Sequence, residues 1–199
     1  MRRKLLALLS AQSALKAFYL AGGTALALQY GHQTSADLDF FSSDPFTEDG
    51  FLSALQNVSG IQVLSRAPET LHLQIGITKV SFIGYHYPPL FALNIFSGAK
   101  IADPRDIAAM KLSAVASRGT KRDFVDLYVL AMRYGLQELL GVFDRKFANL
   151  DYNPIHLLKS LTYFTDADKE PMPKMLQPLT WQDVKDFFTR EAPRLRKRI

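Results

Sequence analysis

The sequence predicts an α/β (α+β) fold, with a mixed sheet flanked by helices over residues 1–100 and a helical C-terminal region over residues 101–199 packed on it. Three observations carry this prediction. A short apolar run, Phe18–Ala21, breaks at two glycines, alternating apolar stretches lie between residues 61 and 87, and apolar residues recur at helical spacing after residue 101. Of the 199 residues, 48% are hydrophobic, which is enough for a substantial core.

The first predicted elements alternate between helix and strand. Leucines at helical spacing predict an amphipathic helix over residues 2–16, and Phe18–Ala21 predicts a buried strand. The apolar pattern from Thr24 to Tyr30 predicts a helix that Thr24 caps and Gly31 ends. After a polar turn, Asp37–Phe41 predicts a second strand.

A further helix and three strands complete the predicted sheet region. Thr47, followed by two acidic residues, is typical of a helix N-cap. The stretches 61–65, 71–75 and 80–85 predict neighbouring, mostly antiparallel strands joined by short turns. Pro88-Pro89 is expected to close the sheet region.

The second half of the chain is predicted to be helical. Asp103-Pro104 is a strong helix start, with the aspartate as N-cap and the proline in the first turn, and this helix is expected to end at Gly119. A second helix is expected to begin near Lys121. Weaker patterns predict helices over residues 135–150, 151–161 and 181–188, with a loop over residues 166–178.

Two carboxylates, Asp37 and Asp39, stand two residues apart in the second predicted strand. Side chains alternate between the faces of a strand, so both carboxylates are expected on one face while Leu38 and Phe40 enter the core. Two like charges this close repel each other, and a cation between them relieves the repulsion. Because Mg²⁺ prefers oxygen ligands, Asp37 and Asp39 are candidate metal ligands.

Gly22, Gly23 and Thr24 join the first strand to the following helix. A backbone without side chains lets a ligand approach closely, and the N–H groups at a helix N-terminus favour an anion. These residues are therefore expected to cradle phosphate oxygens, and with the acidic strand they indicate a metal ion bound to a polyphosphate. The alternative is an ordinary β-turn-α-β unit with an exposed acidic strand.

A second group of charges lies in the predicted helical half. Lys111 interrupts an apolar helix, where a buried ammonium group without a partner is costly. Arg118, seven residues later, projects to the same side, so the two are expected to form a cationic edge that grips a triphosphate. Asp123 and Asp126 also share a face and could pair with Lys111, ligate metal or orient an acceptor. The alternative is a set of surface salt bridges on a helical hairpin.

Composition excludes several kinds of site. The chain has no cysteine, which excludes disulfides, thiolate metal sites and cysteine nucleophiles and favours a cytoplasmic setting. No apolar run is long enough for a membrane helix. The four histidines show no metal-ligand spacing. His32, beside the acidic strand, could approach the site, but it is expected to be a turn residue.

The net charge of +5 is concentrated at the two ends. Residues 2–4 and 194–198 carry +7 between them, so the rest of the chain sums to −2. Such ends could contact nucleic-acid phosphates, or they are a solvated helix start and a basic tail.

Two stretches resemble known families. The Gly22-Gly23 turn, a helix and the Asp37-Leu38-Asp39 strand resemble the nucleotidyltransferase superfamily of the DNA polymerase β type, and the wording GGTALALQYG and DLDFF is similar to the AbiEii/AbiGii toxin family. The segment Asp106–Ala114, then Arg118, then Lys121–Leu127 resembles the lysine helix and the Arg/Lys-Asp-x-x-Asp-Leu segment of that toxin family. The resemblance covers residues 18–130.

This resemblance implies metal-dependent transfer of a nucleoside monophosphate from an NTP to an acceptor. It implies that Asp37 and Asp39 hold Mg²⁺, that Lys111 and Arg118 neutralise the triphosphate, and that Asp123 or Asp126 orients the acceptor or the lysine. It further implies the toxin of a toxin–antitoxin or abortive-infection system, with tRNA or another RNA as acceptor and a cognate antitoxin as partner.

The sequence departs from the superfamily pattern in one place. The superfamily usually carries a third carboxylate on a neighbouring strand, and Lys79–Phe82 contains none. A non-catalytic nucleotide-binding or antitoxin-binding module with the same fold is therefore one alternative. An enzyme that modifies a small molecule, as the aminoglycoside-modifying members of the superfamily do, is another.

Overall fold

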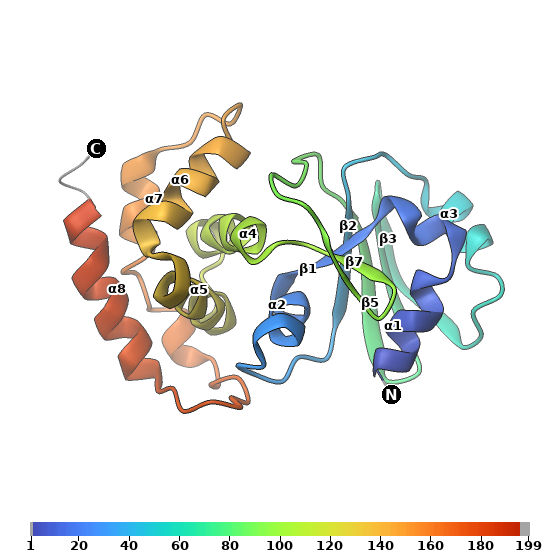
Figure 1. The fold of residues 1–199 in the computed structure, drawn as a ribbon, viewed down its shortest axis with the longest axis horizontal. Coiled ribbons are helices and arrows are strands. Elements are labelled where there is room, and N and C mark those ends of the chain that lie inside the picture. Colours follow the sequence, from blue (N-terminus) through green and yellow to red (C-terminus); the bar gives the residue numbers. More distant parts are fainter. Residues whose placement is uncertain (1, 196–199) are drawn as a thin grey trace. The chain divides into compact units, whose positions relative to one another are not determined.

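The computed structural model describes residues 2–195, apart from the side chains of residues 2 and 3. It contains two compact units, which we call the sheet unit, Met1–Ala25 with Ser35–Asp103, and the helical unit, Leu26–Thr34 with Pro104–Ile199 (Figure 1). The predicted basic tail at residues 196–198 lies outside the described residues. The fold is α/β, as predicted.

The sheet unit contains a mixed sheet of seven strands in the order β3-β4-β5-β2-β1-β7-β6. Strands β1 and β2 are antiparallel, and the pairs β2/β5 and β1/β7 are parallel. The elements are α1 (Arg2–Ser10), η1 (Ser13–Ala17), β1 (Tyr19–Ala21), β2 (Leu38–Ser42), α3 (Glu48–Ala54), β3 (Ile61–Ala67), β4 (Thr70–Ile75), β5 (Thr78–Gly84), β6 (Asn94–Phe96) and β7 (Ala99–Ile101). Helix α2 (Gly22–Tyr30) begins in this unit and ends in the helical unit.

The predictions of one helix over residues 2–16 and of a sheet that closes at Pro88-Pro89 were wrong. Residues 2–16 form two helices, because the Gln12 N–H turns back to the Leu9 carbonyl at 2.9 Å, a tighter turn than the α-helix makes. The sheet also does not close at Pro88-Pro89, since β6 and β7 follow and form its other edge. Each of these strands has three residues, which is too short to show a strand period.

Aromatic rings form the core on one face of the sheet. Phe82 of β5 stacks on Phe40 of β2 with 5.3 Å between ring centroids, and it contacts Phe51 of α3 at 4.4 Å and Phe18 at 5.5 Å. All four side chains are buried. Phe40 and Phe82 therefore point to the face that α3 covers, and Asp39 and Ser81, one residue before each, point to the other face.

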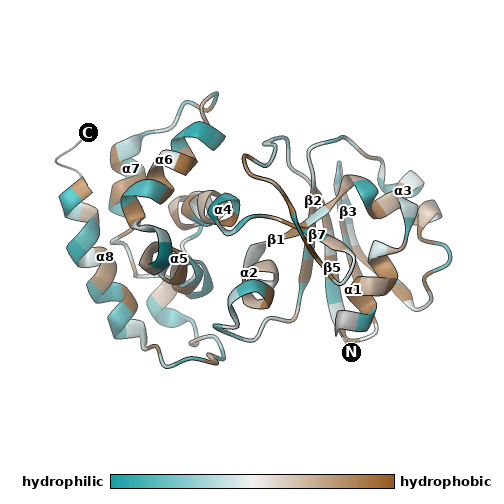
Figure 2. Ribbon diagram, viewed as in Figure 1, coloured by the Kyte–Doolittle hydropathy of each residue, from teal (hydrophilic) through white to brown (hydrophobic). Residues whose placement is uncertain are grey.

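Over the described residues 104–195, the helical unit contains five α-helices. They are α4 (Pro104–Ser117), α5 (Lys121–Tyr134), α6 (Leu136–Lys146), α7 (Pro154–Ser160) and α8 (Trp181–Leu195), with the short η2 (Ala167–Lys169) before α8. Helix α4 begins at Pro104, as predicted, and α8 runs seven residues beyond the predicted end at Phe188. Figure 2 shows apolar and polar stripes alternating around α6 and α8, as expected for helices with one buried face.

The core of the helical unit forms around Phe124 of α5. This fully buried ring contacts Phe164, Trp181 and Phe188, with centroid distances of 5.2, 5.9 and 5.6 Å. These contacts hold α8 and the loop before it against α5. In the part of the chain that the structure describes, no helix is long and apolar enough to cross a membrane.

We expect Phe82→Ala to lower the free energy of unfolding of the sheet unit by about 3–5 kcal/mol, because it leaves a cavity among the three rings that Phe82 contacts. Urea unfolding of the full chain measures this change. Ile77→Ala is the control, since Ile77 is 81% exposed, and it should change the free energy by less than about 0.5 kcal/mol. Equal effects of the two substitutions would contradict this description of the core.

Candidate functional site

The turn between β1 and α2 leaves backbone without side chains next to an acidic residue. Helix α2 starts at Gly22, whose φ of +71° lies in the region that residues with a Cβ rarely adopt. A Cβ built on Gly22 would lie 3.6 Å from Oδ2 of Asp39. We call Gly22 and Gly23 the glycine corner. Its first residue faces the Asp39 carboxylate directly.

Thr24 holds this corner to the strand that follows. The helix begins two residues earlier than predicted, so Thr24 lies inside the first turn and is not the N-cap. Its buried hydroxyl lies 2.6 Å from the Ser35 hydroxyl and donates to the Asp37 carbonyl. Thr24 therefore fixes the backbone that carries Asp37 relative to the start of α2.

The two carboxylates flank the start of β2. Asp39 lies within the strand, whereas Asp37 precedes it by one residue, so the prediction of a strand from Asp37 is one residue too long. Both aspartates are half-buried, while Leu38 and Phe40 are 1% and 2% exposed. The alternation predicted for this strand is thus present, with the apolar residues in the core.

No third carboxylate joins this pair. Asp39 is in register with Ala21 of β1 and with Ser81 of β5, and Ser81 is in turn in register with His72 of β4. Among residues 2–195, no group of three or more His, Cys, Asp or Glu side chains is arranged to hold a metal ion. Mg²⁺ commonly uses one or two carboxylates together with water and substrate phosphates, so Asp37 and Asp39 beside the glycine corner fit a metal that binds with a nucleotide.

A buried ion cluster occupies the centre of the helical unit. Nζ of Lys111 on α4 lies 2.9 Å from Oδ1 of Asp123 and 2.7 Å from Oδ2 of Asp126, both on α5. The exposed fractions of these residues are 8%, 1% and 0%. The predicted partners of the lysine are therefore its actual partners, and the alternative of surface salt bridges is wrong for them.

Arg118 joins the cluster from its edge. Nε and Nη2 of Arg118 donate to the two oxygens of Asp123 at 2.9 and 3.2 Å, and the Thr120 hydroxyl donates to Oδ2 at 2.7 Å. Thr120 also caps α5, since its hydroxyl accepts from the Asp123 N–H. The Arg118 side chain is 65% exposed, so this guanidinium reaches solvent where Lys111 does not.

Two residues that the sequence analysis did not assign to the site support Asp126. His32 Nε2 lies 2.8 Å and Gln33 Nε2 lies 2.7 Å from Oδ1 of Asp126. An ionised carboxylate only accepts hydrogen bonds, so both nitrogens donate. His32 lies in the bend after α2, as predicted for a turn residue, but it is 1% exposed and its ring contacts Asp126. His32 is 94 residues from Asp126 in the sequence, so no local pattern predicts their contact. The one signal in the sequence is that His32 lies five residues before Asp37.

Backbone hydrogen bonds hold this segment in place within the helical unit. The Thr34 N–H donates to the Lys174 carbonyl at 2.9 Å, and the Leu176 N–H donates to the His32 carbonyl at 2.8 Å. Between them, Gln33 and Met175 form an antiparallel bridge. The imidazole and amide that contact Asp126 are thus fixed by their own main chain.

The cluster keeps its members charged. Burial opposes ionisation of Asp123 and Asp126, but the Lys111 charge and the hydrogen bonds outweigh it and lower the pKa of both carboxyls. Burial likewise opposes the charge on Lys111, but the two carboxylates outweigh it and raise the pKa of the ammonium. Lys111, Asp123 and Asp126 are therefore all ionised at neutral pH.

The predicted site residues fall into two groups. Gly22, Gly23, Thr24, Asp37 and Asp39 belong to the sheet unit, where the structure brings the glycine corner, Asp39 and the backbone of Asp37 together. The other four belong to the helical unit and form one connected cluster: Lys111, Arg118, Asp123 and Asp126.

One family model and one curated relative match most of this chain. The family described as "Nucleotidyl transferase AbiEii toxin, Type IV TA system" matches residues 3–98 and 87–197. The uncharacterized protein aq_aa25 of Aquifex aeolicus (strain VF5) is 39% identical over 181 residues, which are 88% of this chain and 86% of that protein.

Two solved structures share the fold. MenT4, a nucleotidyltransferase toxin of Mycobacterium tuberculosis H37Rv, superposes with a TM-score of 0.60 at 17% identity, over 96% of this chain and 81% of that one. JHP933 of Helicobacter pylori superposes with a TM-score of 0.56 at 20% identity, over 99% of this chain and 93% of that one.

We expect Asp126→Asn to lower the free energy of unfolding at pH 7 by about 3 kcal/mol, because the buried Lys111 loses one of its two carboxylates. The lowered pKa of Asp126 means that its ionic contribution is complete above about pH 4 and is lost as the pH falls through the folded-state pKa. The difference in free energy of unfolding between wild type and variant should therefore narrow from pH 7 towards pH 3. Urea unfolding at each pH measures it. Asp151→Asn, in an exposed loop, is the control. If the two free energies of unfolding are equal at pH 7, or if their difference widens in acid, the ionic pairing of Asp126 with Lys111 is wrong.

Proposed function

Because the chain belongs to the AbiEii family of nucleotidyl transferase toxins of type IV toxin–antitoxin systems, we propose that it transfers a nucleoside monophosphate from an NTP to an RNA such as a tRNA. The acceptor hydroxyl oxygen bonds to the α-phosphorus, and the bond from that phosphorus to the pyrophosphate leaving group breaks. The observation that supports this proposal best is the glycine corner, whose backbone faces the Asp39 carboxylate.

The sheet unit is proposed to bind the metal and the phosphates. Asp37 and Asp39 would hold Mg²⁺, which when bound supplies positive charge to the phosphates and lowers the pKa of an acceptor hydroxyl. The N–H groups of Gly22, Gly23 and Thr24, at the start of α2, would donate to phosphate oxygens. The Thr24 side chain keeps this backbone in place through Ser35 and Asp37.

The helical unit is proposed to supply positive charge. Arg118 would contact the triphosphate, since its side chain is largely exposed. Lys111 is balanced by its two carboxylates, so its proposed part in neutralising the triphosphate is to fix Asp123, which in turn holds Arg118. Asp123 pairs with both Lys111 and Arg118, and Asp126 pairs with Lys111. We propose that one of the two aspartates also orients the acceptor.

The family also suggests the biological setting. We propose that a cognate antitoxin neutralises the activity of this protein and that the pair acts in the cytoplasm, where NTPs and tRNA are present. A role in abortive phage infection is part of the same proposal.

One observation favours a second candidate function. Ser81 stands in register with Asp39, and it offers a hydroxyl where a third carboxylate would complete a metal site. A protein with two acids could still bind a nucleotide or an antitoxin without transferring a phosphoryl group. A non-catalytic binding module with this fold is therefore the alternative.

Transfer can be measured by incubating the full chain with Mg²⁺, each labelled NTP in turn and total RNA. We expect label to move to RNA, and Asp39→Asn to slow the transfer by about a hundredfold or more, because a lost metal ligand is worth several kcal/mol of transition-state stabilisation. Asp44→Asn, the same change in the turn after β2, is the control and should keep wild-type transfer. If no acceptor takes label, the enzymatic proposal fails and the binding module stands. If label moves but Asp39→Asn transfers it at the wild-type rate, the proposed role of Asp39 as a metal ligand fails.

Gly22→Ala tests the glycine corner separately. We expect it to destabilise the chain by about 1–2 kcal/mol, because alanine is strained at positive φ, and to reduce transfer because its methyl group points at Asp39. Gly141→Ala is the control, since a Cβ there meets nothing within 4 Å in α6 and should be neutral or stabilising. Wild-type transfer by a folded Gly22→Ala variant would rule out a phosphate cradle at this turn.

A further inference from the structure

A cavity of about 390 Å³ opens on the helical unit, lined by the end of α4, by α7 and by the turn after α7. Its polar lining includes Arg118, His156, Lys159 and Tyr163. We call this cavity the α4–α7 groove. Its volume is within the range of sites that bind small molecules or single nucleotides.

The α4–α7 groove keeps a positive charge. Lys159 is exposed and forms no ion pair with any side chain that the structure describes. Arg118 contributes a guanidinium that is bound to Asp123 on one side but remains 65% exposed. Asp166 is the one acid in the lining, and Lys169 pairs with it at 3.1 Å. Because its acid is neutralised, the groove favours anions.

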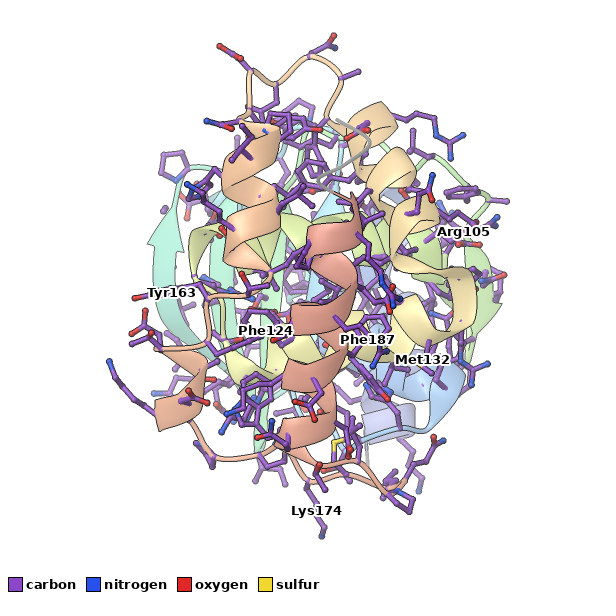
Figure 3. The ribbon with its side chains drawn as sticks, turned by 90° about the vertical axis from the view of Figure 1, so that its left-hand side faces the viewer. Arg105, Phe124, Met132, Tyr163, Lys174 and Phe187 are labelled. Atoms are coloured by element: carbon purple, nitrogen blue, oxygen red, sulfur yellow. The ribbon has the colours of Figure 1, made fainter. Side chains whose placement is uncertain are left out.

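An aromatic ring stands beside these cations. Tyr163 is 58% exposed, which is unusual for a large ring, and Figure 3 shows it at the surface on the side of α8 away from Met132. His156 also lines the groove, and its Nε2 donates to the Ala116 carbonyl of α4 at 3.3 Å. An exposed ring next to cations is the arrangement that binds single-stranded nucleic acid, with stacking on the base and charge on the backbone.

The distribution of charge supports the same ligand. The helical unit carries 17 Lys and Arg residues against 12 Asp and Glu residues, whereas the sheet unit carries seven of each. The whole net charge of +5 therefore belongs to the unit that contains the groove. A positive unit of this kind attracts a polyanion from a distance and raises its rate of association.

We propose that the α4–α7 groove binds a single-stranded segment of the acceptor RNA, with Lys159 on a backbone phosphate and Tyr163 stacked on a base. Arg118 both lines the groove and pairs with Asp123, so it connects the groove to the Lys111 cluster. This inference rests on the proposed function and adds to it a place for the acceptor. A free NTP fits less well, because the cations are spaced around an open groove and no glycine-rich loop surrounds them.

The test uses the full chain and a short fluorescein-labelled single-stranded RNA, with binding followed by fluorescence anisotropy at several salt concentrations and without NTP. We expect Lys159→Ala to weaken binding about three- to tenfold. It should also make the negative slope of log affinity against log salt shallower by about 0.7, the value for one phosphate contact on a single strand. Tyr163→Ala should weaken binding about tenfold and leave the slope unchanged, since stacking carries no charge. Lys174→Ala, an exposed lysine outside the groove, is the matched control and should bind as wild type.

The outcomes separate this inference from the proposed function. If Lys159→Ala and Tyr163→Ala bind the RNA as wild type does, or if Lys174→Ala has the same effect as they do, the groove is not an RNA site. If excess NTP displaces the RNA and Lys159→Ala weakens NTP binding, the groove holds the nucleotide and the inference is overturned. If both groove variants transfer label to RNA with the wild-type KM for RNA, the groove inference fails and the transferase proposal stands. Groove-dependent RNA binding without any transfer would support the groove and sink the transferase proposal.

Discussion

The helical unit depends on the buried pairing of Lys111 with Asp123 and Asp126. Three charges that are almost fully shielded from water are stable only when each is balanced and hydrogen-bonded. Arg118 and Thr120 supply the remaining hydrogen bonds to Asp123, and His32, in the segment before β2, donates one to Asp126. Because no member can be removed without leaving a buried charge, the cluster fixes α4 and α5 relative to each other and holds Lys111 in one position.

The segment Leu26–Thr34 links this cluster to the rest of the chain. It ends α2, which begins at the glycine corner, and it precedes Asp37 by only a few residues. His32 and Gln33 within it contact Asp126. One continuous stretch of about twenty residues therefore carries the phosphate-binding turn, the support of the buried aspartate and the acidic strand. A substitution in this stretch is expected to affect several parts of the proposed site together.

Much of the site could be predicted from local patterns, and the rest could not. Strand alternation indicated the half-buried Asp37 and Asp39 between core residues, and helical spacing indicated that Asp123 and Asp126 could meet Lys111. The contact of His32 with Asp126 could not be predicted, because a contact across 94 residues leaves no local pattern and a polar residue in a turn is normally solvated. The strands β6 and β7 were missed because pairing with neighbours, which the sequence does not show, is what makes such short segments strands.

The central claim is that Lys111 is a permanently charged group that two buried carboxylates hold in place. The most direct test follows the Nζ resonance of Lys111 by NMR in ¹⁵N-labelled protein as the pH is raised, with Lys111→Met used to assign the signal. The structure predicts an ammonium that stays charged through neutral pH and titrates above the ordinary lysine pKa of about 10.4. A Lys111 signal that titrates near or below neutral pH would contradict the account, because a neutral amine cannot balance Asp123 and Asp126.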